Sequence, residues 1–402
     1  MDKSRKQVVI LYVATFMSTI LNFVASKVNT DYLSPADYGN VRYVFNIIQL
    51  FSWVVLFGWF MSGSRLLALS DNRKYSARIR GALIVLLMVA TAMLMIITFA
   101  SGLIHTDNHT IRTLFYCAIP VCMYPLLTNY INTTAQGDNH IGRLALARLL
   151  PVLCYIPIAL LVYGRYGADS RTVIWMHWGI CATVIIMIII STRPSFKDLK
   201  PVFRSLGEEN RSYGIQLYWG SLAMVATNYL AGVVLGFMDM DKSNVGFYTL
   251  ALSFAQPLSY LPGIVGTTLF KRFAQEERIS KKVFVVTIAI TVITCIGFIV
   301  LVHPVMSLYN ESYGVVAKYA SFLAIGFSMH GVGDMINRYL GSHGQGRSIR
   351  NSSFACGAVK ITGSFILVWL WSVNGAILTM ILSSAVYALS LYVEYRIFVN
   401  RK

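Results

Sequence analysis

Twelve stretches of about twenty mostly apolar residues alternate along the chain with short polar segments. A helix that rises about 1.5 Å per residue needs about 20 residues to cross a hydrocarbon layer of about 30 Å. Each stretch therefore predicts one membrane-spanning helix, and together they predict an all-α, polytopic membrane protein. The predicted spans are 8–28, 41–62, 82–103, 112–132, 144–163, 172–191, 214–237, 246–268, 283–302, 315–335, 351–371 and 374–398.

One polar pattern occurs twice, half the chain apart, on two of these predicted helices. Steps of three and four residues place each copy on one helical face. The first copy is Gly39, Arg42, Asn46, Gln49 and Trp53, and the second is Gly246, Thr249, Ser253, Gln256 and Tyr260. Each copy is preceded by a related tetrapeptide, Asn-Phe-Val-Ala from residue 22 and Asn-Tyr-Leu-Ala from residue 228. A duplicated polar stripe on helices of this length predicts a pseudo-symmetric transporter whose halves face a shared pathway.

The longest predicted connection is basic and divides the chain into two halves. We predict a six-helix bundle over 1–192, a cytoplasmic linker over 193–213 and a second six-helix bundle over 214–402. Because each half has an even number of spans, both halves start on the same side of the membrane. The two repeats are therefore predicted to be parallel, related by an axis along the membrane normal.

The distribution of charge indicates the orientation. The 402 residues are 56% apolar and 13% charged, with a net charge of +17. With the amino terminus inside, 26 basic residues fall on inner segments and seven on outer ones. This asymmetry predicts that both termini are cytoplasmic. Nucleic-acid binding is not expected, because the basic residues form no compact domain.

Several kinds of chemistry are not expected from this sequence. No connection is long enough for a soluble catalytic domain, and no GxxxxGK[ST] motif is present, so we expect no catalytic site, no cofactor and no ATP-driven step. No metal site is expected either. Asp239 and Asp241 fall in a short outer turn, and His105 and His109 in a loop-like stretch.

Polar and charged residues within the predicted spans are candidates for substrate binding. The first span carries a polar face that includes Asn22, which could instead hydrogen-bond to neighbouring helices. A charge at the centre of a span costs about 2.5–3.5 kcal/mol on insertion scales, and Lys360 is the deepest basic residue. Asp334 and Arg338 lie one turn apart and are expected to pair. A small excess of interior positive charge suits an anionic substrate such as a phosphate.

Several local motifs resemble those of a known family. The stretch from Tyr32 to Gly39 (YLSPADYG) is similar to the LGPxxYG turn after the first helix of prokaryotic polysaccharide flippases, and Val245–Tyr248 (VGFY) resembles its second-half counterpart. Asn374–Ile377 matches the GxxGA entry to the last helix, and Gly137 and Gly341 fit the small inner turns. The chain thus resembles the O-antigen and oligosaccharide flippases (Wzx-type) of the multidrug/oligosaccharidyl-lipid/polysaccharide (MOP) exporter superfamily. Many members have Arg before the Pro-containing turn, where this chain has Asp31.

The resemblance implies a MATE-like fold with a V-shaped central cavity. It also implies that an undecaprenyl-pyrophosphate-linked oligosaccharide moves from the cytoplasmic to the outer leaflet of the bacterial inner membrane by alternating access. Expected partners are that lipid-linked glycan, membrane lipids, a glycan polymerase and a chain-length regulator. The energy source stays open between a proton gradient, a sodium gradient and the membrane potential.

Thirteen residues are predicted to bind the substrate in this interpretation. Polar side chains would hydrogen-bond the glycan, aromatic rings would stack on it, and cations would balance the pyrophosphate. In that order they are Asn22, Asn46, Gln49, Asn228, Ser253 and Gln256; Trp53, Tyr229 and Tyr260; and Lys27, Arg42, Arg148 and Lys360.

Two other functions are the alternatives to this one. A cation-coupled multidrug exporter of the same superfamily would favour buried carboxylates, whereas Asp334 and Glu394 lie only near the inner ends of their spans. A polytopic glycan polymerase or sugar transferase would need a substantial outer loop, and none is predicted.

Overall fold

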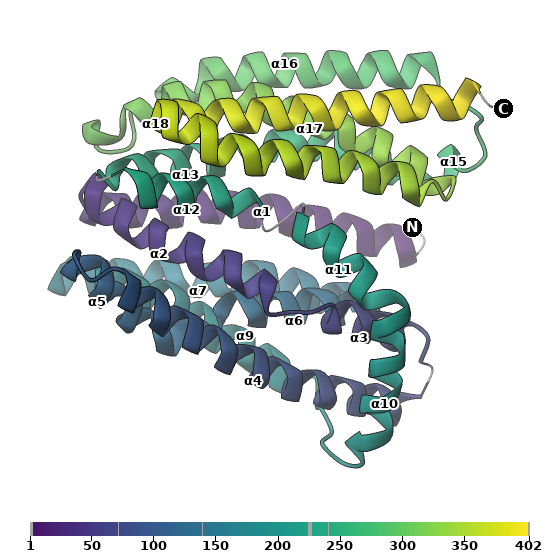
Figure 1. The fold of residues 1–402 in the computed structure, drawn as a ribbon, viewed down its shortest axis with the longest axis horizontal. Coiled ribbons are helices and arrows are strands. Elements are labelled where there is room, and N and C mark those ends of the chain that lie inside the picture. Colours follow the sequence, from purple (N-terminus) through teal and green to yellow (C-terminus); the bar gives the residue numbers. More distant parts are fainter. Residues whose placement is uncertain (1–2, 71, 139, 224–226, 240, 401–402) are drawn as a thin grey trace. The chain divides into compact units, whose positions relative to one another are not determined.

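The computed structural model describes residues 3–70, 72–138, 140–223, 227–239 and 241–400, which are helical almost throughout. Two compact units make up the chain, and they are described separately. Unit 1 consists of Met1–Leu33 and Val44–Leu222, and unit 2 consists of Ser34–Tyr43 and Ala223–Lys402. Figure 1 labels the helices in chain order. One helix, α2, begins in unit 2 and ends in unit 1.

The predicted spans of the first half coincide with helices. Their bounds are α1 Lys3–Tyr32, α2 Pro35–Val54, α3 Trp59–Ala68, α4 Arg73–Ile104, α5 His109–Ala118, α6 Tyr124–Gly137, α7 Ile141–Tyr166, α8 Ser170–Ile174 and α9 Ile180–Ser191. Two further helices follow, α10 Leu199–Glu209 in the predicted linker and α11 Ile215–Ser221 at the start of the predicted seventh span. Pro120 lies in a 3₁₀ turn between α5 and α6, as expected for a residue that lacks a backbone N–H. In unit 1, α1 packs against α7, α3 against α6, and α7 against α9.

The second half is built from fewer, longer helices. They are α12 Thr227–Met238, α13 Ser243–Ala255, α14 Tyr260–Thr268, α15 Phe270–Phe273, α16 Lys281–Met306, α17 Val315–Ser342 and α18 Gly346–Asn400. Ser372 interrupts α18 with φ 48° and ψ −125°, so this element is two helical limbs. The limbs lie side by side, because a Cβ on Gly363 would come within 2.7 Å of Thr379 Oγ1 (Figure 1).

Seven helical segments in the described part of the chain are long and apolar enough to cross a membrane. An eighth is the pair α2 and α3, which together pass the same test but meet at a bend of 60°. Because α18 counts once in this set although it has two limbs, the total of twelve spans stays a prediction. The chain is nevertheless a polytopic all-α membrane protein, as the sequence predicted.

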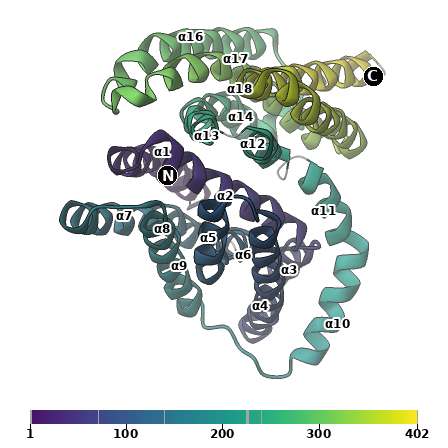
Figure 2. The same ribbon diagram turned by 60° about the vertical axis from the view of Figure 1, so that its left-hand side comes forward.

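The two units differ from the predicted halves in three places. Residues 214–222, predicted to begin the second bundle, belong to unit 1. The segment predicted as a linker contains helix α10, which packs against α3 and α4 within unit 1 (Figure 2). Residues 34–43 belong to unit 2, because a Cβ on Gly39 would collide with the backbone of Lys242. The first polar stripe is therefore divided, with Gly39 and Arg42 in unit 2 and Asn46, Gln49 and Trp53 in unit 1.

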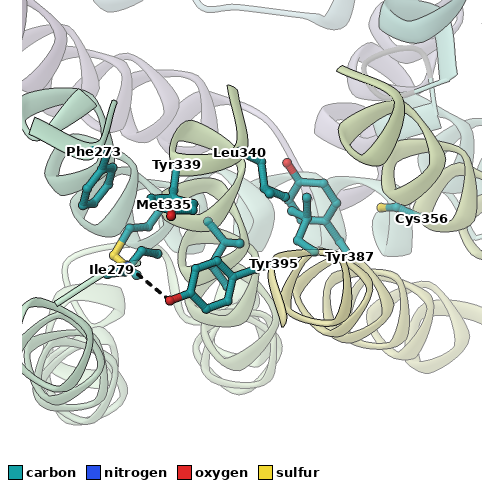
Figure 3. Packing of buried hydrophobic residues seen from close by; sticks show 10 residues of the cluster. Phe273, Ile279, Met335, Tyr339, Leu340, Cys356, Tyr387 and Tyr395 are labelled. Carbon is teal, nitrogen blue, oxygen red and sulfur yellow. Dashed lines mark hydrogen bonds between the residues drawn. The ribbon is translucent and has the colours of Figure 1, made fainter. Parts of the chain in front are cut away.

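The end of unit 2 that contains α15 has an aromatic core. Phe273, Met335, Tyr339 and Tyr387 are each fully buried. The hydroxyl of Tyr395 accepts a hydrogen bond from the backbone N–H of Ile279 at 3.1 Å (Figure 3). Each tyrosine thus combines a buried ring with a hydrogen-bonded hydroxyl, the arrangement that makes burial of this residue favourable. The cluster joins α15 and the start of α16 to α17 and the second limb of α18.

Candidate functional site

The first copy of the polar stripe lies on one continuous helix. Asn46 is buried, whereas Gln49 and Trp53 are partly exposed along α2. Phe45, beside the stripe, stacks on Trp178 with ring centroids 3.9 Å apart, which holds this part of α2 against the rest of unit 1. Arg42 lies over the ring of Tyr38 and its Nε donates to the Tyr38 hydroxyl at 2.9 Å.

The second copy is not on one continuous helix. Ser253 lies near the end of α13 and its hydroxyl donates to the carbonyl of Thr249 at 2.9 Å. Gln256 opens a 3₁₀ turn, Gln256–Ser259, that contains Pro257, and Tyr260 begins α14. Gln256 and Tyr260 are exposed, so the second stripe is more open than the first.

Two cations lie on corresponding predicted spans of the two halves. Arg148, on the fifth predicted span, donates from Nη1 to the hydroxyl oxygen of Thr15 on the first span at 2.5 Å. Lys360, on the eleventh, donates from Nζ to the amide oxygen of Asn228 on the seventh, also at 2.5 Å. Spans five and eleven occupy the same place in each repeat, as do spans one and seven. The structure therefore repeats a contact between a cation and a neutral oxygen, which the sequence comparison missed.

Lys360 is a buried cation whose hydrogen-bond partner is a neutral group. Its side chain is buried, with 4% of the residue exposed, and none of the ion pairs among the described residues includes it. The hydrogen-bond partner of this ammonium is thus a neutral amide oxygen, which an anionic oxygen can replace. By contrast, Lys27 forms an ion pair with Asp31 at 2.8 Å, so its charge is already compensated.

The remaining predicted residues have more local contacts. Asn22 is exposed and donates from Nδ2 to the carbonyl of Ser18, one turn earlier in its own helix, at 2.7 Å. Tyr229 is partly exposed on α12, next to Asn228. Of the thirteen predicted binding residues, Asn228 and Lys360 thus contact each other through a hydrogen bond. The other members are distributed over the two units.

The expected pair between Asp334 and Arg338 was wrong. The carboxylate of Asp334 accepts a hydrogen bond from the hydroxyl of Tyr387 at 3.1 Å, and the amide of Asn337 donates to that hydroxyl at 2.7 Å. Arg338 is exposed, and no ion pair in the described ranges joins it to Asp334. The ring of His330 stacks on Tyr387 at 4.5 Å. Sequence spacing identified the acid but could not identify partners on another helix.

The motifs set aside from the sequence have structural roles. The carboxylate of Asp239 accepts hydrogen bonds from Ser372 and Asn244, both at 2.6 Å. Burial alone would raise the pKa of Asp239, but these hydrogen bonds, a backbone N–H and the nearby Lys242 outweigh it and hold the pKa below its usual range. In the part of the chain that the structure describes, no three His, Cys, Asp or Glu side chains form a group that could hold a metal ion.

The sequence matches a known protein family. The family model described as "Polysaccharide biosynthesis protein" matches residues 4–277, which is more than half of the sequence. The chain therefore belongs to the polysaccharide biosynthesis protein family. No curated protein matches the sequence.

Solved structures share the fold at low sequence identity. The lipid II flippase MurJ in an inward closed conformation aligns with a TM-score of 0.75 and 15% identity, over 96% of this chain and 87% of that one. An inward-facing MATE-family multidrug resistance transporter of the MOP superfamily aligns with a TM-score of 0.72 and 13% identity, over 98% of each chain. The eukaryotic MATE transporter AtDTX14 aligns with a TM-score of 0.65 and 14% identity, over 100% and 99%. The fold is thus that of flippases and exporters.

Proposed function

We propose that this protein is a flippase for an undecaprenyl-pyrophosphate-linked oligosaccharide, the repeat unit of an O-antigen or a similar surface glycan. The observation that carries the proposal is the match to the polysaccharide biosynthesis family over residues 4–277. A fold shared with a lipid II flippase supports it, because a lipid-linked sugar is the kind of molecule that the other protein's name gives as its substrate. The protein would act in the bacterial inner membrane, with both termini in the cytoplasm.

The duplicated cations suggest how the pyrophosphate is recognised. Arg148 and Lys360 each donate to a neutral oxygen, and a pyrophosphate oxygen would compete for these donors. A cation is attracted more strongly to a charged oxygen than to a neutral one, which favours the exchange. Arg42 would assist from its position over Tyr38, whereas Lys27 would have to leave Asp31 first.

The polar stripes would bind the glycan. Gln49, Ser253 and Gln256 offer hydrogen-bonding groups that the protein leaves partly exposed, and Trp53, Tyr229 and Tyr260 offer stacking faces. The polyprenyl tail would stay in lipid while the head group moves along a pathway to which both stripes contribute. A glycan polymerase and a chain-length regulator are the proposed downstream partners.

The membrane potential can drive this movement. Moving one charge through 100 mV is worth about 2.3 kcal/mol. An outward-moving dianion in an inside-negative cell therefore gains about 4–5 kcal/mol if its charge crosses uncompensated. Coupling to a proton or sodium ion is the alternative, and Asp334 with its Tyr387 partner is where unit 2 would accept it.

A multidrug exporter is the second candidate, favoured by the partly buried carboxylate of Asp334 and by the shared fold of MATE transporters. Deletion of the gene separates the two functions. The flippase proposal expects lipid-linked single repeat units to accumulate on the cytoplasmic face, with no change in drug sensitivity. Drug sensitivity with normal surface glycan would instead establish the exporter, and accumulation of outward-facing, unpolymerised units would indicate a polymerase.

Reconstitution tests the activity directly. Proteoliposomes would be loaded with a short-chain polyprenyl-pyrophosphate oligosaccharide, and the sugar exposed on each leaflet would be followed with an impermeant oxidant. The proposal expects protein-dependent flipping that is accelerated by a potential negative on the side of origin. No flipping above protein-free vesicles would contradict it.

A further inference from the structure

Helix α2 ends abruptly just after the polar stripe. Residues 55–58 separate α2 from α3, and the two helices meet at 60°. Phe57 and Gly58 have φ angles of 45° and 79°, a left-handed conformation that is unfavourable for Phe. A break in a membrane helix also frees backbone carbonyls that must find other donors, because lipid offers none. Something outside the two helices must therefore hold this bend.

The donors come from the segment that connects the two halves of the chain. The amide Nδ2 of Asn210 donates to the carbonyl of Phe57 at 3.1 Å, and the hydroxyl of Tyr218 donates to the carbonyl of Val54 at 2.8 Å. The same Asn210 accepts from the hydroxyl of Ser62, on α3, at 2.9 Å. One side chain thus contacts the backbone of the break through its donor and the following helix through its acceptor.

The packing around Asn210 leaves little room for movement. Only 8% of the residue is exposed, and it opens a π-helical turn, Asn210–Gly214, that continues α10. A Cβ on Gly58 would lie 2.5 Å from the carbonyl oxygen of Gly214, so the two backbones approach as closely as glycine allows. Single π-turns inside α-helices occur frequently at functional sites.

A second contact fixes the start of the same turn to α3. Arg65 pairs with Glu209 at 2.8 Å and lies over the ring of Tyr213 at 4.6 Å from the ring centroid. Contacts on both sides of Asn210 therefore attach the connecting segment to the broken helix, all within unit 1.

We propose that Asn210 is a positioning residue for transport: it fixes the bend between α2 and α3 and thereby the direction of the α2 face that carries Asn46, Gln49 and Trp53. The consequence for transport rests on the proposed function, whereas the bend itself does not. Since Asn210 lies on the connection between the halves, a displacement of that connection reaches the bend through this side chain, alongside the contacts of Tyr218 and Glu209.

Two variants test the hydrogen bond apart from the packing. Asn210→Leu preserves most of the volume and removes both polar contacts. Asn210→Asp preserves the shape and the acceptor for Ser62 but loses the donor to Phe57. Ser212→Ala is the matched control, because this serine lies in the same turn, is exposed, and donates only to the nearby carbonyl of Glu209.

The readout for the bend is hydrogen–deuterium exchange of the full-length protein in lipid nanodiscs. In both Asn210 variants, we expect the amides of residues 55–62 to exchange roughly tenfold faster than in the wild type, the equivalent of one lost hydrogen bond. Exchange in α16, in the other unit, should not change, and Ser212→Ala should match the wild type throughout. Unchanged exchange at 55–62 in Asn210→Leu would overturn the inference, because it would mean that packing alone holds the bend.

The readout for positioning is glycan flipping per molecule of reconstituted protein. We expect it to fall roughly tenfold in both Asn210 variants and to stay at the wild-type rate in Ser212→Ala. Faster exchange with wild-type flipping would overturn the positioning role. If the wild type itself does not flip the glycan, the proposed function fails, and the exchange measurement still decides whether Asn210 holds the bend.

Discussion

The two halves of this protein share one arrangement and differ in another. In both, a cation on the fifth helix of the repeat donates to a neutral oxygen on the first: Arg148 to Thr15, and Lys360 to Asn228. The second helix of the repeat differs. In the first half it is unbroken through the stripe and bends afterwards, whereas in the second half it breaks inside the stripe, at Gln256–Ser259.

This difference shows that a repeated spacing of polar residues does not fix where a helix breaks. Pro257 removes a backbone donor in the second copy and leaves a 3₁₀ turn there. The first copy has no proline at the corresponding place, so its helix continues to Val54 and depends on Asn210 and Tyr218 for donors at the bend. The conserved part is the chemistry of the cations, and the variable part is the local geometry of the stripe.

The largest expected effect concerns the shared cations. Replacing both, with Arg148→Met and Lys360→Met, should lower flipping of the pyrophosphate-linked glycan about a hundredfold, or about 2.7 kcal/mol, if each contributes a charge-assisted hydrogen bond. Each single variant should lower it about tenfold, and Lys360→Arg should retain most of the activity. Flipping in proteoliposomes measures this. A double variant that flips at the wild-type rate would show that the repeated cations are structural only.

The next effect concerns the packing of α17 against the helix break in the second polar stripe. A Cβ on Gly331 would lie 2.7 Å from the carbonyl oxygen of Ser259 and 2.9 Å from its Cα, so Gly331→Ala must displace backbone at the break. We expect a loss of about 2 kcal/mol of stability, within the range for overpacking. Gly220→Ala is the control, since a Cβ there meets nothing within 4 Å. Thermal unfolding in detergent compares the two. Equal midpoints would mean that α17 does not support this break.

A smaller effect is expected at the bend that follows the first polar stripe. Tyr218→Phe removes only the hydroxyl that donates to Val54, and should cost about 1 kcal/mol. Tyr166→Phe, at the exposed end of α7, should be neutral. The same unfolding measurement applies, with exchange at residues 55–62 as the local readout. A neutral Tyr218→Phe would leave Asn210 as the residue that holds the bend.

The smallest effect is a difference in how the stability of two helix breaks depends on pH. At the break in α18, Ser372 donates a hydrogen bond to the carboxylate of Asp239. At the bend after α2, the carbonyl of Phe57 accepts its hydrogen bond from the neutral amide of Asn210. The pKa of Asp239 is lowered in the folded protein. The carboxylate therefore contributes to stability above its unfolded-state pKa of about 3.9, and this stability is lost as the pH falls through the lower folded-state pKa. Ser372→Ala should cost about 1 kcal/mol near neutral pH and less in acid. A cost independent of pH would contradict this assignment.

Much of the all-α architecture could be predicted from the sequence, because the length of an apolar stretch is a local signal. The predicted spans of the first half are helical and the turn before Gly39 is present, whereas helix α10 lies in the segment predicted as a linker. The partners of buried polar groups could not be predicted, since they lie on distant segments: Tyr387 for Asp334, Asn228 for Lys360, and Asn210 for the carbonyl of Phe57. The π-turn at Asn210–Gly214 was likewise missed, because the segment reads as a polar linker.

The most direct test of the account is whether the two polar stripes meet water and substrate. Gln49→Cys and Gln256→Cys, each in a cysteine-free background, would be treated with an impermeant maleimide in native membranes. The control is Ile293→Cys, on the exposed apolar surface of α16 that is expected to face lipid. The account predicts that both stripe cysteines react, that the control does not, and that a short-chain pyrophosphate-linked oligosaccharide slows the reaction at both. Stripe cysteines as inert as the control would contradict the claim that these residues line a transport pathway.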